Sequence, residues 1–379
     1  MDFALSPKHE MMKAMFREFA EKEVAPLAAE LDEKSEFSWD LYRKMGQIGM
    51  FGLPYPQEYG GAGADYLTFV LACEEIGRAC TSSAMLINGQ NSINSGPIYR
   101  QGTEEQKRKY LVPIITGKAL GAFCLTEADA GTDASNQQTT AVPDGSEWVI
   151  DGTKMFITNA GLADIYIIMA MTGTGNNPKG ISAFIVEKDA PGLSFGKKEN
   201  KMGVRASQTA EVILQDCRIP KENLLGKEGE GFKIAMQNLD SGRIGVGAIS
   251  LGIAQAALDE STKYAKERQQ FGRPIGANQA IQWMIADMAT ELEAARYLVY
   301  RAAWLRDQKK AHSKEASMAK LFASELAMRA SVKAVQIHGG YGYMKEYKVE
   351  RLMRDAKVCE IFEGTSEVQR MVISRAALT

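Results

Sequence analysis

The pattern of apolar and polar positions changes character twice along the 379 residues of the chain. Residues 1 to about 120 predict helices. Ser6 followed by a proline is typical of a helix start, because serine caps the first turn and proline suits the first helical position. Thr103 and Gln106 have the spacing of a capping box ahead of an apolar run. The glycines of segment 59–63 indicate a turn with positive φ between these helices.

Residues 121–226 predict a small β domain. Short β-branched and aromatic segments, separated by Gly, Asn, Asp and Pro, are typical of strands. These segments are Trp148–Gly152, Ile165–Ala170, Ile181–Val186 and Val212–Leu214. The run Thr172–Gly180 is a turn-rich connection.

Residues 227–379 predict long helices. Apolar residues that step by four and three positions form one stripe along a helix of many turns: Ile281, Ile285, Met288, Leu292, Ala295, Val299 and Ala302. Helices of this length usually pack side by side in a bundle. Because the chain is too long for one ordinary core, we predict an α+β multidomain fold. Its domains are 1–120 with N-terminal helices, 121–226 with the β structure, and 227–379 with a C-terminal helical bundle.

Charge and composition narrow the classes of partner. Lys plus Arg number 45 and Asp plus Glu number 47, which leaves a net charge of −2 and no general attraction to nucleic acid or an anionic membrane. The five cysteines are scattered without a CxxC pair and three histidines are present, so we expect no metal site or disulfide framework and a reducing cytoplasm. Segment Met1–Pro7 does not have the pattern of a signal peptide, and no apolar run of about 18 residues predicts a membrane span.

Glu363 is the first candidate for chemistry. It lies between Phe362 and Gly364, and apolar surroundings disfavour a charged carboxylate and raise its pKa toward the range of a general base. The competing interpretation is a glutamate that ends a helix on the surface. In the same part of the chain, the pair Gly339-Gly340 indicates a backbone that closely approaches another group.

Two polar segments near the predicted start of the β domain could hold a ligand. The loop Phe123–Asp133 carries Thr126 and Thr132, which can offer hydroxyl and backbone N–H groups to a phosphate or a polar ring edge. It is neither a GxGxxG nor a Walker loop, and an ordinary polar connector is the alternative. In an extended segment, Phe156 and Thr158 would share one face and suit a flat heterocycle. A core phenylalanine beside a surface threonine is the alternative there.

Two further segments contain arginines, and for each of them a structural role competes with ligand binding. Arg243, near a predicted helix start, suits an anionic ligand group or a surface ion pair with Asp240. Segment Glu267–Pro274 ends a helix with basic and aromatic residues, for which a structural role at the helix end is the default.

Five separated motifs, taken together and in order, resemble the acyl-CoA dehydrogenase family of flavoenzymes from about residue 3 to the C-terminus. The motifs are Thr126–Asp133, Lys154–Asn159, Arg268–Pro274, Gln336 with Gly339-Gly340, and Phe362–Thr365. The resemblance implies an N-terminal helical domain, a middle β domain and a C-terminal four-helix domain. It also implies that FAD binds between the β domain and the C-terminal helices.

The resemblance further implies roles for individual residues. Those expected to contact FAD within one subunit are Phe123, Leu125, Thr126, Gly131, Thr132, Phe156, Thr158, Thr365 and Glu367. Those expected to contact FAD of a neighbouring subunit are Arg268, Gln270, Phe271, Gln336, Gly339 and Gly340. A site shared in this way needs an oligomer, and the resemblance implies a homotetramer.

By the same resemblance, Glu363 is the base that removes the α-proton of a CoA thioester while the β-hydrogen leaves as hydride to flavin N5. The thioester oxygen would be polarised by a ribityl hydroxyl and the backbone N–H of Glu363, as in an oxyanion hole. Some relatives carry the base at the position of Gly242, which cannot serve here. The residues expected to bind substrate are Thr132, Asp240, Arg243, Phe362 and Gly364.

The leading functional prediction is dehydrogenation of a short-chain acyl-CoA, with electrons passed to electron-transferring flavoprotein. The second is the reverse reaction of an enoyl-CoA or arylacrylyl-CoA reductase, because segment 337–351 is similar to both groups. Acyl-CoA oxidases are usually longer chains, and preservation of the base and the flavin-contacting residues argues against a non-catalytic scaffold. The polar run Asn88–Ser92 is expected at the floor of the acyl pocket, with a solvent-facing helix turn as the alternative.

Overall fold

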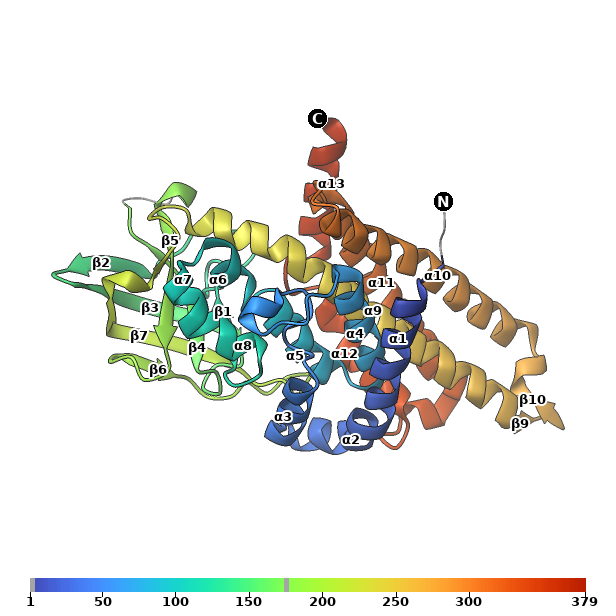
Figure 1. The fold of residues 1–379 in the computed structure, drawn as a ribbon. Coiled ribbons are helices and arrows are strands. Elements are labelled where there is room, and N and C mark those ends of the chain that lie inside the picture. Colours follow the sequence, from blue (N-terminus) through green and yellow to red (C-terminus); the bar gives the residue numbers. More distant parts are fainter. Residues whose placement is uncertain (1–3, 174–176) are drawn as a thin grey trace.

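The computed structural model describes residues 4–173 and 177–379. Two short stretches lie outside the described residues: residues 1–3, which belong to segment Met1–Pro7, and residues 174–176, which belong to the predicted Thr172–Gly180 connection. Figure 1 shows a β domain at one end of the molecule and helices over the rest of its length.

The first part of the chain is helical, as predicted. Its α-helices are α1 (Pro7–Phe19), α2 (Ala25–Lys34), α3 (Trp39–Gln47), α4 (Tyr66–Ala79), α5 (Thr81–Asn91), α6 (Gly96–Gln101), α7 (Glu104–Gln106) and α8 (Val112–Ile115). Both predicted caps are confirmed: the Ser6 side chain accepts from the backbone N–H of His9, and Thr103 and Gln106 form the capping box. Gly60 and Gly63 have positive φ, as expected for the turn. Every residue of α5 is buried, so the solvent-facing alternative for its polar residues is wrong.

The middle part forms one sheet. Its strands are β1 (Gly121–Cys124), β2 (Thr140–Asp144), β3 (Glu147–Thr158), β4 (Ile165–Met171), β5 (Ile181–Glu187), β6 (Leu193–Phe195), β7 (Thr209–Pro220) and β8 (Leu224–Leu225). The order is β6-β7-β3-β2-β4-β5-β8, with β1 paired in parallel to β4. The four predicted segments lie in β3, β4, β5 and β7. The others are short or largely exposed, as in β2, and carry little hydrophobic pattern.

The last part consists of long helices joined by short connections. They are α9 (Gly231–Glu267), α10 (Gln279–Asp307), α11 (Ser313–His338), α12 (Lys348–Cys359) and α13 (Ser366–Leu378), with a small hairpin of β9 (Gln269–Gln270) and β10 (Arg273–Pro274) after α9. The predicted stripe lies on α10, where Met288, Leu292, Ala295, Val299 and Ala302 are buried and Ile281 and Ile285 pack against the core. The predicted helix end at Glu267 is also confirmed.

Helix α9 connects the two ends of the molecule. It leaves the β domain, crosses the helical part and ends at the β9–β10 hairpin, which lies far from the sheet (Figure 1). Gly77 on α4 faces the backbone of Ile249 on α9, so these helices approach each other more closely than larger side chains would allow. One hydrophobic core runs through both helical parts and one face of the sheet, and this continuity fixes the β domain against α9.

All five cysteines are buried and free of disulfide bonds. Within residues 4–173 and 177–379, no helix is long and apolar enough to cross a membrane. The same residues contain no group of three or more His, Cys, Asp or Glu side chains that could hold a metal ion.

Candidate active site

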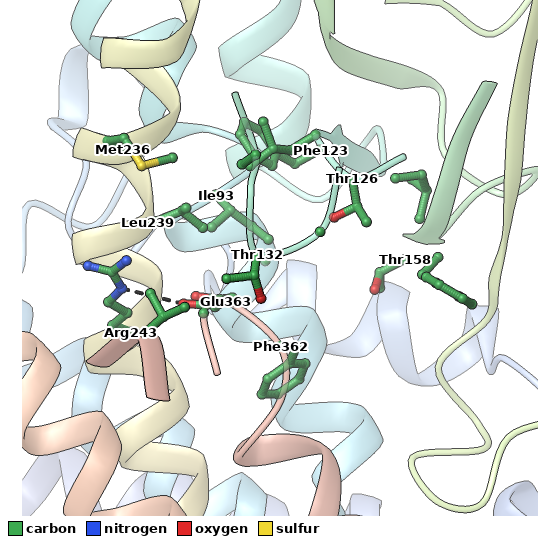
Figure 2. A pocket seen from close by; sticks show the side chains of 18 of the residues that line it. Ile93, Phe123, Thr126, Thr132, Thr158, Met236, Leu239, Arg243, Phe362 and Glu363 are labelled. Carbon is green, nitrogen blue, oxygen red and sulfur yellow. Dashed lines mark hydrogen bonds between the residues drawn. The ribbon is translucent and has the colours of Figure 1, made fainter. Parts of the chain in front are cut away.

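Two adjoining cavities of about 300 and 570 Å³ lie where β1, β3, α5, α9 and the turn after α12 meet. They share part of their lining, including Thr126, Phe156, Thr158 and Glu363. Figure 2 shows the Glu363 side chain among Thr132, Arg243 and Leu239, with Thr126 and Thr158 on the opposite side of the space. The sites predicted from three distant parts of the sequence therefore meet around one space.

The Glu363 carboxylate has two different oxygen environments. Its Oε1 accepts a hydrogen bond of 3.0 Å from the side-chain amide of Asn88 on α5. Its Oε2 is buried and has no hydrogen-bond partner among the described residues. Burial raises the pKa of Glu363 to about 7, although Lys320, Arg243 and Asn88 act in the opposite direction. The surface alternative for this glutamate is wrong, and a carboxylate with this pKa can exchange a proton near neutral pH.

The backbone around Glu363 adopts a left-handed turn. Glu363 has φ of 53° and Gly364 has φ of 97°, a conformation that is uncommon for a residue with a side chain. The Gly364 carbonyl accepts from Lys320 Nζ and Gln369 Nε2, both at 2.8 Å. The Glu363 carbonyl accepts from Arg243 Nε at 3.4 Å. Such backbone strain persists only where neighbouring contacts hold it, and it is common at functional sites.

Gly242 provides the space that the Glu363 side chain occupies. A Cβ atom built at position 242 would overlap Glu363 Oε2 and would also lie 2.9 Å from Ile93 Cγ2. Position 242 therefore cannot carry a base while Glu363 keeps this position. The glycine is required by its neighbour rather than by its own backbone conformation.

The loop after β1 contributes the polar wall of the cavities. Phe123 on β1, and Leu125, Thr126, Gly131 and Thr132 on the loop that follows it, all line them. A Cβ atom at Gly131 would meet nothing within 4 Å, so this backbone faces open space.

A buried ion pair supports this loop from behind. Lys154 Nζ on β3 lies 2.6 Å from Glu127 Oε1, and both side chains are almost completely buried. The Glu127 carboxylate also accepts from the backbone N–H groups of Gln138 and Thr139. The pair thus ties the loop to the sheet at both of its ends.

Phe156 and Thr158 both line the cavities, but not through the regular extended geometry that we expected. The pairing of β3 with β7 shifts register between Lys154 and Ile157, and Phe156 has φ of 57°. This irregularity is a bulge, which bends a strand and redirects its side chains. Phe156 is 63% exposed, so its interpretation as a core residue is wrong.

Arg243 and Asp240 form an ion pair of 2.8 Å on α9. The pair is not at the surface, because the Arg243 side chain is only 7% exposed. Arg243 also lies well inside α9, rather than near its start as we expected. Arg243 lines the smaller cavity with Phe362 and Gly364.

A second group of predicted residues lies elsewhere on the chain. Arg268, Gln270, Gly339 and Gly340 line a separate cavity of about 430 Å³ with Tyr264, His338 and Tyr341. Phe271 is 99% exposed on the hairpin, and Gln336 is exposed on the last turn of α11. Figure 1 shows the hairpin at the end of the molecule opposite to the sheet. One chain therefore does not bring these residues to the Glu363 cavities.

Of the two predicted residues at the start of α13, one lies at the cavities and the other does not. Thr365 is the N-cap of α13 and lines the larger cavity. Glu367 lies exposed in the first turn of α13, outside the cavity lining.

The polar run of α5 reaches the cavity only in part. Asn88 and Gly89 line it, whereas Gln90 and Asn91 do not. Gln90 instead donates to the Tyr42 hydroxyl, and Asn91 donates to the carbonyls of Met50 and Ile87. The expectation for the whole run was wrong because successive helical residues face different directions.

Sequence reasoning missed Lys320 and the contact between Asn88 and Glu363. Lys320 is fully buried on α11 between small residues such as Ser317 and Ser324. A lysine at helical spacing within a stripe of small residues was a readable signal for a buried cation. The Asn88 contact joins residues 275 positions apart and had no local signal.

Comparison with known proteins identifies the family. The models of the N-terminal, middle and C-terminal domains of acyl-CoA dehydrogenase match residues 6–118, 122–217 and 229–378. The chain is 52% identical to the short-chain specific acyl-CoA dehydrogenase of Clostridium acetobutylicum over 99% of both chains. It is 50% identical to the caffeyl-CoA reductase-Etf complex subunit CarC of Acetobacterium woodii, over 97% of this chain and 98% of that one.

The structure is also similar to the solved structure of butyryl-CoA dehydrogenase from Megasphaera elsdenii. The alignment covers 100% of both chains, with 47% identity and a TM-score of 0.98. The order of an N-terminal helical part, a middle β domain and a C-terminal helical part is the same as that of the matched domains. The chain belongs to the acyl-CoA dehydrogenase family.

Proposed function

We propose that this protein removes hydrogens from the α and β carbons of a short-chain acyl-CoA, with Glu363 as the base. The observation that carries the proposal is the buried, unpartnered Oε2 of Glu363 at the cavity wall. A carboxylate whose pKa is raised to about 7 by burial is ionised in part at neutral pH and holds a proton strongly enough to remove it from carbon. The short-chain assignment is supported by the name of the 52% identical relative from Clostridium acetobutylicum.

FAD is the cofactor of this family, and the residues at the cavities fit a flat, polar-edged ring. Thr126 and Thr158 offer hydroxyls, Phe123 and Phe156 offer ring faces, and the open backbone at Gly131 suits a phosphate. We propose that these residues, with Leu125, Thr132 and Thr365, hold it. When bound, FAD supplies the acceptor for the hydride that leaves the β carbon.

The protein's own groups would perform the proton transfer. The Glu363 carboxylate takes the α-proton through Oε2, because Oε1 is already bound by Asn88. The Glu363 backbone N–H polarises the thioester oxygen, so that negative charge developing there meets a fixed donor. The contacts of Arg243 and Lys320 with adjoining carbonyls keep this N–H and the carboxylate in a fixed relation.

The ion pair of Asp240 and Arg243 would contact the CoA ester, together with Thr132, Phe362 and Gly364. Arg243 already lies at the cavity and keeps a buried positive charge near the place of reaction. We place electron-transferring flavoprotein as the redox partner, since the Acetobacterium woodii relative is named as a subunit of a complex with such a protein.

A homotetramer in the cytoplasm is part of the proposal. The cavity lined by Arg268, Gln270, Gly339 and Gly340 would receive the distal part of FAD bound by a neighbouring subunit, with Gln336 and Phe271 at its edge and Glu367 near the cofactor. The two groups of residues line separate cavities, and the hairpin that carries Gln270 lies far from the sheet (Figure 1), which supports such sharing. We retain 1–120, 121–226 and 227–379 as the domain ranges.

A second candidate function is the reduction of an enoyl-CoA or arylacrylyl-CoA by the same site. The 50% identity to a caffeyl-CoA reductase subunit favours it. Protonated Glu363 would then return the proton to the α carbon. This is the reverse of the proton transfer proposed for dehydrogenation. Comparing flavin reduction by saturated esters with flavin reoxidation by unsaturated esters, under anaerobic conditions, separates the two directions.

Replacement of Glu363 by glutamine tests the proposed base. The Glu363→Gln protein should keep its flavin absorbance and its binding of a CoA ester but lose bleaching of the flavin by butyryl-CoA. Bleaching at near the wild-type rate would show that another group removes the proton. A purified wild-type protein without flavin absorbance would instead favour a non-catalytic scaffold.

A further inference from the structure

We propose that Asn88 is a positioning residue that holds the Glu363 carboxylate by one oxygen and leaves the other oxygen free for the substrate. This inference rests on the proposed role of Glu363 as base. It gives a residue of the N-terminal helices a direct contact with the proposed base.

The carboxylate has a single hydrogen-bond donor within residues 4–173 and 177–379, and it is the Asn88 amide. Asn88 Nδ2 lies 3.0 Å from Glu363 Oε1. The two nearest cations bind elsewhere: Arg243 Nε donates to the Glu363 carbonyl and Lys320 Nζ to the Gly364 carbonyl. The orientation of the carboxylate therefore depends on a neutral amide and not on an ion pair.

Asn88 is itself held in place. Its side chain is fully buried, and its Oδ1 lies 2.9 Å from the hydroxyl of Ser92, one turn further along, which also lies 2.5 Å from the Asn88 carbonyl oxygen. On the other side, Asn88 Oδ1 fills the space beside Gly245 on α9, where any Cβ atom would overlap it. With Oδ1 directed to Ser92, the amide presents its N–H group to Glu363. A rigid donor loses little conformational freedom when it acts on the carboxylate.

The charge balance around the carboxylate explains why a neutral donor is useful there. The titratable and charged groups that face Glu363 are Arg243 from α9, Lys320 from α11 and Cys73 from α4. Burial raises the pKa of Glu363, and the two cations and Asn88 lower it. An amide donor stabilises the ionised form without forming a close ion pair, which would lower the basicity further.

The test compares Asn88→Ala with the wild type in anaerobic flavin bleaching by butyryl-CoA between pH 6 and pH 9. Loss of the donor should raise the apparent pKa of the bleaching rate. A rise of about one pH unit lowers the ionised fraction, and hence the rate at pH 7, by about fivefold and leaves less effect at pH 9. Loss of orientation should also lower the rate at the alkaline plateau, with the flavin spectrum retained.

Asn91→Ala is the matched control. Asn91 is another fully buried amide of α5, but it binds the carbonyls of Met50 and Ile87 and has no contact with Glu363. Both variants lose a buried amide, so both should lower the melting temperature. Only Asn88→Ala should move the pH profile. A wild-type profile in a folded, FAD-containing Asn88→Ala protein would overturn the proposal.

Ser92→Ala decides the question if Asn88→Ala loses FAD. This variant removes the hydroxyl that lies against both Asn88 Oδ1 and the Asn88 carbonyl but keeps the amide itself, so the profile should move in the same direction by a smaller amount. An unchanged profile would then contradict the proposal. Glu363→Gln separates this failure from failure of the proposed function. If Glu363→Gln is inactive while Asn88 and Ser92 variants keep the wild-type profile, Glu363 is the base and Asn88 does not position it.

Discussion

The Glu363 carboxylate occupies the space in which a side chain at Gly242 would have to lie. These two residues are far apart in sequence, and one excludes a side chain on the other. Gly242→Ala should therefore displace the carboxylate and reduce flavin bleaching by at least about tenfold, since small misplacement of a reacting group is costly. Alanine is otherwise favoured over glycine within a helix. The melting temperature and the flavin content thus provide the control, and a normal bleaching rate would mean that Glu363 can move without loss.

Lys320 should affect the rate without contacting the reacting atoms. Its ammonium group donates to the Gly364 carbonyl and lowers the pKa of Glu363. Lys320→Met removes both effects. We expect a lower bleaching rate at pH 7 and an apparent pKa displaced to higher pH, because a nearby cation favours the ionised carboxylate. Lys333→Met is the control and should leave the profile unchanged, because Lys333 lies on α11 like Lys320 but pairs with the exposed Asp287 of α10.

The pH dependence of the wild type follows from the raised pKa of Glu363. The base must be ionised, so bleaching should increase from pH 6 to pH 8 with a midpoint near the value of about 7 given by burial. Stopped-flow measurements with a saturated CoA ester would report this midpoint. A profile that is flat across this range would contradict proton removal by Glu363.

The same pKa predicts an effect on stability. Burial raises the pKa of the Glu363 carboxyl from its ordinary value of 4.5 to about 7 in the folded protein. Between these values the folded state keeps a proton that the unfolded state has released, so the folded state loses relative stability as the pH rises. Glu363→Gln removes this loss. Its melting temperature should exceed that of the wild type more at pH 8 than at pH 5, and an equal difference at both pH values would contradict the burial of an ionisable carboxylate.

The Lys154–Glu127 pair should be necessary to hold the loop after β1, which we propose contacts FAD. Lys154→Met leaves Glu127 charged and buried, which typically costs about 3–5 kcal/mol of folding free energy. We expect a large decrease in the denaturant midpoint and loss of FAD. The double variant Lys154→Met with Glu127→Leu should recover part of the stability, because neither charge remains buried. If the double variant is less stable than Lys154→Met, the two residues do not act as a pair.

The parts of the fold that depend on local pattern were predictable from the sequence. The cap at Ser6, the stripe on α10 and the four longest strands each leave a signal within a few residues. The positive φ of Phe156 left none, because it results from the shifted pairing of β3 with β7. The approach of Asn88 to Glu363 likewise depends on how α5 packs against α9, and that packing is set by the whole core.

For the candidate site, the residues that take part were predictable, but their arrangement in space was not. The residues around Glu363 are those that the resemblance to the acyl-CoA dehydrogenase family implies, and most of them line the cavities. Their geometry was not predictable, since the carbonyl contacts of Lys320 and Gln369 that hold the turn come from two other helices. From the sequence, Gly242 is only a position that lacks a basic side chain. In the structure, its missing side chain also leaves the space that the Glu363 carboxylate occupies.

The length of α9 has a consequence for how the cofactor is retained. Its 37 residues extend about 55 Å; Arg243, well inside the helix, lies beside the Glu363 cavity, and Arg268 directly follows its last residue. If neighbouring subunits complete each cofactor site through the far cavity, association of subunits and occupancy by FAD become linked equilibria. Dilution alone should then release flavin, and added FAD should drive the subunits back together.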